Sequence, residues 1–141
     1  MSERHGANAV EPIRDLGKIQ EIKNYLLARS YRDYFLFVFG INSGLRISDI
    51  LPLKVMDVKY TRHLKVREKK TGNARKIVIT NALRKEIDKY TKNLADSDYL
   101  FPSRKGGKPI HRVQAWQLIR DAAKACNVEL SPYNCVKTEL L

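Results

Sequence analysis

The feature that most restricts the fold is an apolar run over residues 34–41, followed by the motif-like stretch Asn42–Leu53. A helix that is apolar nearly all round is covered by other elements rather than exposed on one face. Residues 31–42 are therefore predicted to form a central helix, which is too short for the roughly 20 residues that span a bilayer. Gly44, which tolerates a positive φ, is predicted to end this helix.

Arg46 and Asp49 bring charge into this apolar neighbourhood. Their spacing places them on neighbouring positions of a short helix that is expected from Arg46 to about Leu51. A guanidinium in apolar surroundings is costly unless its five donors are satisfied. One interpretation is a buried or half-buried ion pair that serves the fold. The other is a rigidly held arginine that binds a phosphate through two parallel hydrogen bonds.

The overall charge is strongly positive, with 27 Lys and Arg against 15 Asp and Glu, a net charge of +12. Such a balance is typical of a polyanionic partner, most often nucleic acid. The 141 residues, 43% of them hydrophobic, suffice for one domain with a core. Residues 1–10 lack the apolar centre of a signal peptide, and a cytoplasmic protein is expected.

Metal ligands are sparse in this sequence. Cys126 and Cys135 are too few for a four-ligand zinc site, and His5, His63 and His111 show no metal spacing. No metal, cofactor or disulfide framework is predicted.

The remaining periodic segments predict an α+β, mainly helical domain. Helices are expected after Asp15, with an end at Arg29–Ser30, and after Thr80 or Asn81. Residues 63–68 and 75–79 alternate apolar and polar side chains around a Gly-Asn turn and predict a β-hairpin, and Lys54–Val58 is interpreted as connecting chain. A last helix, ending near Asn127, is indicated by a stripe of Val113, Trp116, Leu118 or Ile119, Ala122, Ala123 and Cys126.

The predicted hairpin is strongly basic. Between residues 59 and 76 there are eight Lys and Arg against one acid, Glu68, so this segment carries +7 of the +12. Lysines on a hairpin can simply protect a solvated sheet edge. A tip with adjacent Lys69 and Lys70 beside a hydroxyl and a glycine can instead follow a phosphate backbone or a minor groove. The glycine-rich segment 104–109 is basic too, but it is not a nucleotide-binding loop.

Four motifs in this order resemble the catalytic domain of the tyrosine recombinases, the phage integrase family. They are Ser-Gly-Leu-Arg-Ile-Ser-Asp-Ile at 43–50, Lys-Lys-Thr-Gly at 69–72, Tyr-Leu-Phe-Pro-Ser at 99–103 and Gly-Lys-Pro-Ile at 107–110. The resemblance covers about residues 11–130 and is greatest to small bacterial proteins, so a bacterial or phage origin is expected. It implies a helical bundle with a small basic hairpin, with a divergent C-terminal tail at 131–141. The polar composition of residues 1–10 predicts a flexible N-terminal arm.

The resemblance also implies residue roles. Arg46 is similar to the family's first catalytic arginine, which binds the scissile phosphate, and Asp49 to the acidic residue that buttresses it. Lys70 is similar to the hairpin lysine that acts as general acid for the leaving 5′-hydroxyl, with Lys69 as the fallback. Guanidinium groups suit this task because charge builds on the nonbridging phosphate oxygens. Further DNA contacts are expected from Thr71, Arg75, Lys76, Arg104, Lys105, Lys108 and Arg112.

The family's other catalytic residues are not matched. The family has a His-x-x-Arg element after the last helix, then a further His or Trp and a tyrosine that forms a 3′-phosphotyrosyl intermediate. Here Tyr133 and Val136 occupy the His and Arg positions, and the sequence ends at Leu141 before a tyrosine nucleophile. Tyr90 and Tyr99 are interpreted as packing residues. A truncated domain that cannot cleave DNA is expected.

Two functions are compatible with this sequence, and a third is weaker. The first is double-stranded DNA binding in site-specific integration and recombination, by a truncated or frameshifted copy. The second is a non-catalytic module, monomeric off DNA, that regulates an intact recombinase through shared sites or subunit contacts. RNA binding is disfavoured because the hairpin offers no aromatic stacking platform.

Overall fold

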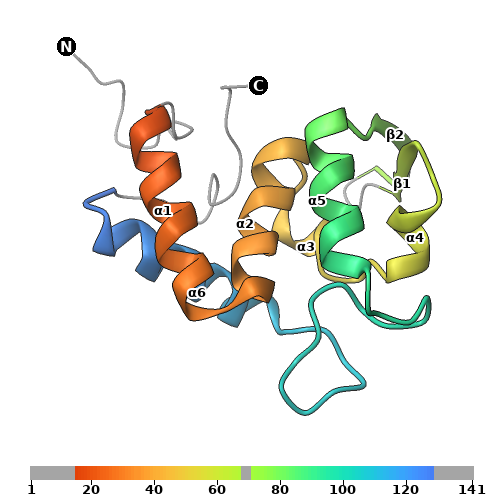
Figure 1. Ribbon diagram of the computed structural model, residues 1–141. Helices are drawn as coiled ribbons and strands as arrows, with labels where there is room; N and C mark the ends of the chain where they lie inside the picture. The colour runs from red at the N-terminus through yellow and green to blue at the C-terminus, as the bar shows by residue number, and fades with distance from the viewer. Residues whose placement is uncertain (1–14, 68–70, 129–141) are drawn as a thin grey trace.

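The computed structural model describes residues 15–67 and 71–128, which form a helical bundle with one hairpin at its side (Figure 1). The predicted class, α+β and mainly helical, is confirmed. In chain order the elements are α1 (Leu16–Arg29), α2 (Tyr31–Ser43), α3 (Ile47–Ile50), α4 (Val55–Lys59), β1 (His63–Arg67), β2 (Ala74–Val78), α5 (Asn81–Thr91) and α6 (Arg112–Ala125).

Local capping explains where the first two helices begin and end. The Asp15 side chain accepts hydrogen bonds from the N–H groups of Gly17 and Lys18 at the start of α1. Ser30 ends α1, and its side-chain oxygen caps α2. Gly44 ends α2 in the left-handed region, with φ of 69°. These predicted boundaries are confirmed, and the short connections pack α1 against α2.

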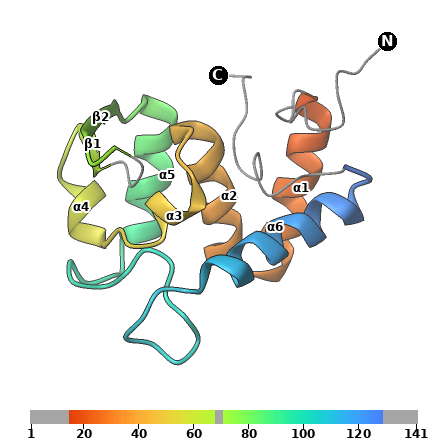
Figure 2. The same ribbon diagram turned by 180° about the vertical axis from the view of Figure 1, so that it is seen from behind.

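The central element is α2, as predicted. Its residues 35–41 are all buried, and it packs against α1, α5 and α6. Figure 2, the view from behind, shows α6 crossing in front of the lower ends of α1 and α2. Each large apolar side chain buried in this way contributes about 1.5–3 kcal/mol. The stretch 35–41 therefore offers no polar side chain to solvent, and the candidate functional residues lie outside it.

An aromatic cluster fixes the contact between α2 and α5. The Phe35 and Tyr90 rings stack with centroids 4.1 Å apart, and Phe101 lies 5.7 Å from Phe35. The Tyr90 hydroxyl donates to the carbonyl of Leu100 at 2.5 Å, and burial raises the pKa of Tyr90. The half-buried ring of Tyr99 carries the Lys54 ammonium at 5.2 Å from its centroid. Both tyrosines therefore serve packing, as predicted.

Two local predictions are wrong. The segment interpreted as connecting chain contains α4, because Val55 and Val58 bury one face and the Asp57 carboxylate accepts the Lys54 N–H at 2.8 Å. The apolar stripe of α6 does not include Val113, which is 48% exposed. The fully buried positions of α6 are Ala115, Ile119, Ala122 and Ala123.

The predicted hairpin is confirmed. Its strands pair antiparallel, from His63 opposite Val78 to Arg67 opposite Ala74. In β1 the side chains of Leu64 and Val66 are buried and the alternate ones are exposed. Because one face is buried, the register is fixed, and it decides which side chains face solvent.

Candidate nucleic-acid interface

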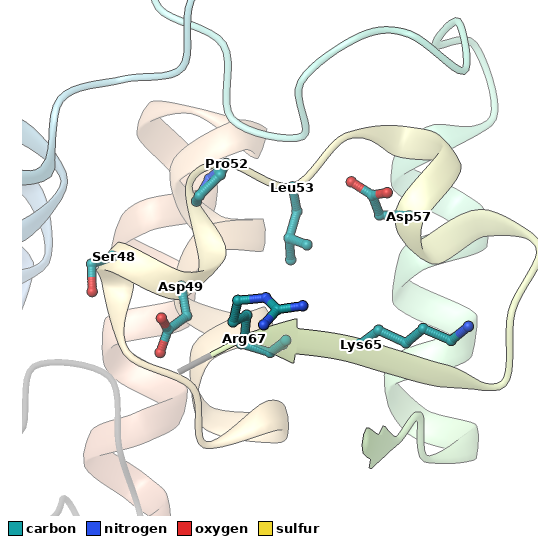
Figure 3. Close-up of a pocket in the computed structure, with 8 residues that line it drawn as sticks. Ser48, Asp49, Pro52, Leu53, Asp57, Lys65 and Arg67 are labelled. Atoms are coloured by element: carbon teal, nitrogen blue, oxygen red, sulfur yellow. The ribbon is translucent and has the colours of Figure 1, made fainter. Parts of the chain in front are cut away.

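A pocket open to solvent lies where α3 and α4 face β1 (Figure 3). Its volume is about 270 Å³. Figure 3 shows Asp49 on α3 and Arg67 at the end of β1 on adjoining walls. The pocket thus joins the helix that follows Arg46 to the basic hairpin. It is lined by Ser48, Asp49, Pro52, Leu53, Asp57, Lys65, Val66 and Arg67.

Arg46 is exposed and precedes α3 as its N-cap, with extended backbone at φ −74° and ψ 154°. Its neighbours Leu45 and Ile47 are 2% and 6% exposed. The extended backbone therefore turns Arg46 outward while both neighbours enter the core. Within residues 15–67 and 71–128, Arg46 makes no ion pair with Asp49. The interpretation as a buried ion pair is wrong, and the guanidinium is accessible to a ligand.

Asp49 is half-buried in the first turn of α3 and lines the pocket. A carboxylate here lies within one helical turn of Arg46, but the two make no direct ion pair in the described ranges. Its expected role as support for Arg46 stays a prediction.

The solvent side of the hairpin carries a basic face, made of Lys65, Arg67 and Lys76. Directly opposed residues of an antiparallel pair share a face, and Lys65 lies directly opposite Lys76. All three side chains are exposed. Like charges in opposed positions destabilise a sheet. The basic face is therefore an unfavourable arrangement for the protein alone and a favourable one for binding an anion.

Lys65 and Arg67 are residues that the sequence prediction counted as basic but did not assign to the site. The alternation that predicts β1 could have found them, because it places His63, Lys65 and Arg67 on one side of the strand. Arg75, which was assigned, lies opposite Val66 instead. It is exposed, but it projects from the other face of the hairpin.

The hairpin tip is described only in part. Thr71 is exposed, and its Oγ1 accepts the N–H of Asn73 at 3.2 Å, so it shapes the turn. Arg67 Nη1 donates to the Gly72 carbonyl at 2.9 Å and closes the tip from the β1 side. The predicted general acid Lys70 and its alternative Lys69 lie outside the described residues. So do Tyr133 and Val136.

A second basic region is the loop that carries Arg104, Lys105 and Lys108. Figures 1 and 2 both place it at the end of α5 away from the hairpin. The loop is closed by the N–H of Ser103, which donates to the Lys108 carbonyl at 2.8 Å, and by residues 106–107 at φ of 74° and 75°. Its three basic side chains are exposed. The predicted DNA contacts therefore fall into two separate regions.

Arg112 begins α6 close in sequence to this loop and is exposed. His111 precedes it as the N-cap, and its Nδ1 accepts the Val113 N–H at 3.1 Å. Arg112 therefore extends the second basic region rather than the hairpin.

Within residues 15–67 and 71–128, the structure holds no group of three or more His, Cys, Asp or Glu side chains placed to bind a metal ion. None of the helices in these ranges has the length and hydropathy that crossing a membrane requires.

Residues 15–135 match the sequence model of the phage integrase family. The chain belongs to the phage integrase family. The probable integrase/recombinase YoeC of Bacillus subtilis is 56% identical to this integrase-family chain over 120 residues, which are 85% of the chain and 66% of that protein. Tyrosine recombinase XerA of Pyrococcus horikoshii is 30% identical over 118 residues, 80% of the chain and 41% of XerA. The chain spans less than two thirds of the length of these curated relatives.

Solved integrase structures share the fold of this family member. XerA recombinase superposes with a TM-score of 0.70 and 18% identity, covering 92% of this chain and 48% of XerA. The lambda integrase catalytic core superposes with a TM-score of 0.66 and 18% identity, covering 87% and 73%. At this identity the likeness concerns the fold.

Proposed function

We propose that this chain binds double-stranded DNA and serves site-specific integration and recombination. The observation that carries the proposal is the opposed pair Lys65 and Lys76 on the basic face. Two like charges in this arrangement cost about 0.2–1 kcal/mol of sheet stability. A polyanion that lies across them relieves the repulsion, and the counterions it releases add to the affinity. DNA supplies phosphates along its whole length, and the similar proteins YoeC and XerA are named as integrase or recombinase.

In this proposal Arg46 binds the scissile phosphate. The side chain is exposed, and the residues that follow it line the pocket beside β1. An arginine binds a phosphate through two parallel hydrogen bonds and stabilises the charge that builds on its oxygens. Asp49 supports Arg46 from the same helix. Lys70, or Lys69, follows β1 in the chain and takes the place of the general acid that protonates the leaving 5′-oxygen in recombinases that cleave DNA.

We further propose that residues 1–141 bind DNA without cleaving it. The reason is the identity of Tyr133 and Val136, which occupy the positions of the family's His-x-x-Arg element. A valine has no donor for a phosphate oxygen. Loss of one such donor typically lowers the rate about 10²–10³-fold. Incubation with a nicked suicide duplex should yield no covalent adduct, and a phosphotyrosyl adduct on a denaturing gel would contradict this part.

Fluorescence anisotropy with a labelled mixed-sequence duplex, measured over a salt series, tests the binding. The logarithm of the affinity should fall linearly with the logarithm of salt, with a slope of about 0.9 for each phosphate contact. An affinity that does not change with salt would exclude a basic interface. Tighter binding to single-stranded RNA than to the duplex would favour the RNA alternative.

The assembly state is part of the proposal. We propose a monomer off DNA that associates with intact recombinase subunits on shared sites, in the cytoplasm. Light scattering of the protein alone should give the mass of one chain. A dimer at micromolar concentration without DNA would contradict the first half, and failure to enter a complex of recombinase and DNA would contradict the second.

A further inference from the structure

Arg84, in the first turn of α5, holds the turn that leads from α4 into β1. Its Nη2 donates to the carbonyl of Val58 at 2.8 Å and also to the carbonyl of Thr61. Its Nη1 donates to the carbonyl of Lys59 at 3.0 Å and to Asp88 Oδ1 at 3.1 Å. The Arg84 side chain is 27% exposed. Most of its surface is therefore enclosed by groups of the protein itself.

The shape of the guanidinium explains why an arginine stands here. The last carbonyls of a helix such as α4 have no partner inside the helix, and a cation at a helix C-terminus is favourable. The two terminal nitrogens of Arg84 reach three carbonyls from both sides of this turn. A lysine presents its donors from one nitrogen and cannot span the same acceptors. The contact therefore depends on geometry as well as on charge.

Both strands of the hairpin are tied to this same turn of α5. On the β2 side the connection is the chain itself, because Thr80 follows the strand closely and caps α5 by accepting the Leu83 N–H. The Ile79 N–H donates to the Arg62 carbonyl at 2.9 Å and joins the strand ends. On the β1 side the connection is Arg84. Figure 1 shows α4 and the hairpin together beside α5.

We propose that Arg84 is a positioning residue, which sets the direction in which the hairpin leaves the domain. This inference rests on the proposed DNA binding. Arg84 does not contact DNA, because protein groups accept hydrogen bonds from both of its terminal nitrogens, Nη1 and Nη2. Without them β1 pivots about residues 60–62, and the basic face moves relative to the pocket and to Arg46. One bound DNA then no longer contacts Arg46 and the basic face at the same time.

Arg84→Lys is the decisive variant because it keeps the charge and removes the fork. Its affinity for a labelled duplex, measured by anisotropy, should be about fivefold weaker than that of the wild type. Lys85→Gln is the matched control: it removes a whole charge at the adjacent exposed position, and it should weaken binding by about twofold at most. If Arg84 acted on DNA only through its charge, this order would be reversed.

A double-mutant cycle shows whether Arg84 acts through the hairpin. In the double variant of Arg84→Lys and Lys76→Ala, the fold-loss of DNA affinity should be smaller than the product of the two single fold-losses, because both changes affect the same contact. For Arg84→Lys with Arg112→Ala, on α6, the fold-loss should equal the product. Without DNA, hydrogen exchange of the amides in 63–67 and 74–78 should be faster in Arg84→Lys. Asp88→Asn, a milder variant that removes the charge of one acceptor of Nη1 and so weakens that hydrogen bond, should raise the same exchange by less.

Unchanged affinity of Arg84→Lys overturns the inference, and so does a multiplicative loss with Lys76→Ala. If the wild type does not bind the duplex, the proposed function fails instead. Hydrogen exchange then still decides about Arg84, since unchanged hairpin exchange in both variants shows that it does not position the strands.

Discussion

Lys65 and Lys76 lie opposite each other in the hairpin, and this arrangement lowers the stability of the fold but favours DNA binding. Lys76→Gln removes the repulsion with Lys65. We expect the free energy of unfolding to rise by about 0.2–1 kcal/mol, while the salt slope of DNA binding falls by about 0.9. Urea unfolding and salt-dependent anisotropy measure both. Lys89→Gln is the control, because Lys89 is exposed on α5 and lies outside the hairpin. Lower stability of Lys76→Gln would contradict the argument.

Arg46 provides the second prediction at the residue scale. Because its side chain is exposed, Arg46→Ala should change the free energy of unfolding by no more than about 0.5 kcal/mol. Binding to duplex DNA should weaken about tenfold or more, since a hydrogen bond to a charged group contributes about 1.5–3 kcal/mol. Arg29→Ala, at the exposed C-terminal end of α1, is the control for simple loss of charge. Equal losses for the two variants would remove Arg46 from the site.

At the scale of elements, the junction of α2 and α3 depends on one backbone conformation. Gly44 has φ of 69°, and an added Cβ would meet no atom within 4 Å. Gly44→Ala should therefore cost about 1–2 kcal/mol through the backbone alone. Gly44→Asn should cost less, because Asn tolerates the left-handed region. Urea unfolding of both variants measures this. An alanine variant as stable as the wild type would show that α3 can begin without this turn.

The contact between α2 and α5 predicts a dependence on alkaline pH. The Tyr34 hydroxyl donates to Glu86 Oε2 at 2.8 Å. Burial first, and then Glu86, raises the pKa of Tyr34 from 10.0 to about 12. The unfolded chain therefore ionises before the folded one. The stability is present in full below pH 10 and is lost as the pH rises toward about 12.

Unfolding by urea at a series of pH values from 9 to about 12 tests this linkage. Tyr34→Phe should flatten the decline without abolishing it, because the pKa values of Tyr31 and Tyr90 are raised as well. Glu86→Gln should flatten it in part, since it removes the charge but leaves the burial. A decline as steep in Tyr34→Phe as in the wild type would assign the effect to other groups.

At the scale of the whole molecule, the two basic regions lie at opposite ends of α5. Neutralising Arg104 and Lys105 to Gln should lower the salt slope of DNA binding by up to about 1.8. When these changes are combined with Lys76→Gln, the losses of DNA-binding free energy should add, because the two regions share no partner. A short duplex that reaches only one region should respond to only one set of variants. If binding of such a duplex weakened equally with both sets of variants, the two basic regions would not be separate binding regions.

The sequence by itself determined both ends of α1, both ends of α2 and the start of α5, because the signals that set them act over a few residues. Asp15, Ser30, Gly44 and Thr80 cap or end helices through groups two to four positions away. The motifs around Arg46 and the hairpin also sufficed to identify the family. The short helix α4 escaped prediction because Val55 and Val58 are helical positions only once the domain buries them.

Only the tertiary structure decided how the candidate site is built. Arg46 faces solvent because the core takes the residues on either side of it, which no local pattern states. Lys65 opposes Lys76 because two strands pair in one register. Arg84 reaches the turn before β1 because α5 packs against α4. Charge and motifs are written in the sequence, but the direction of a side chain depends on what covers its neighbours.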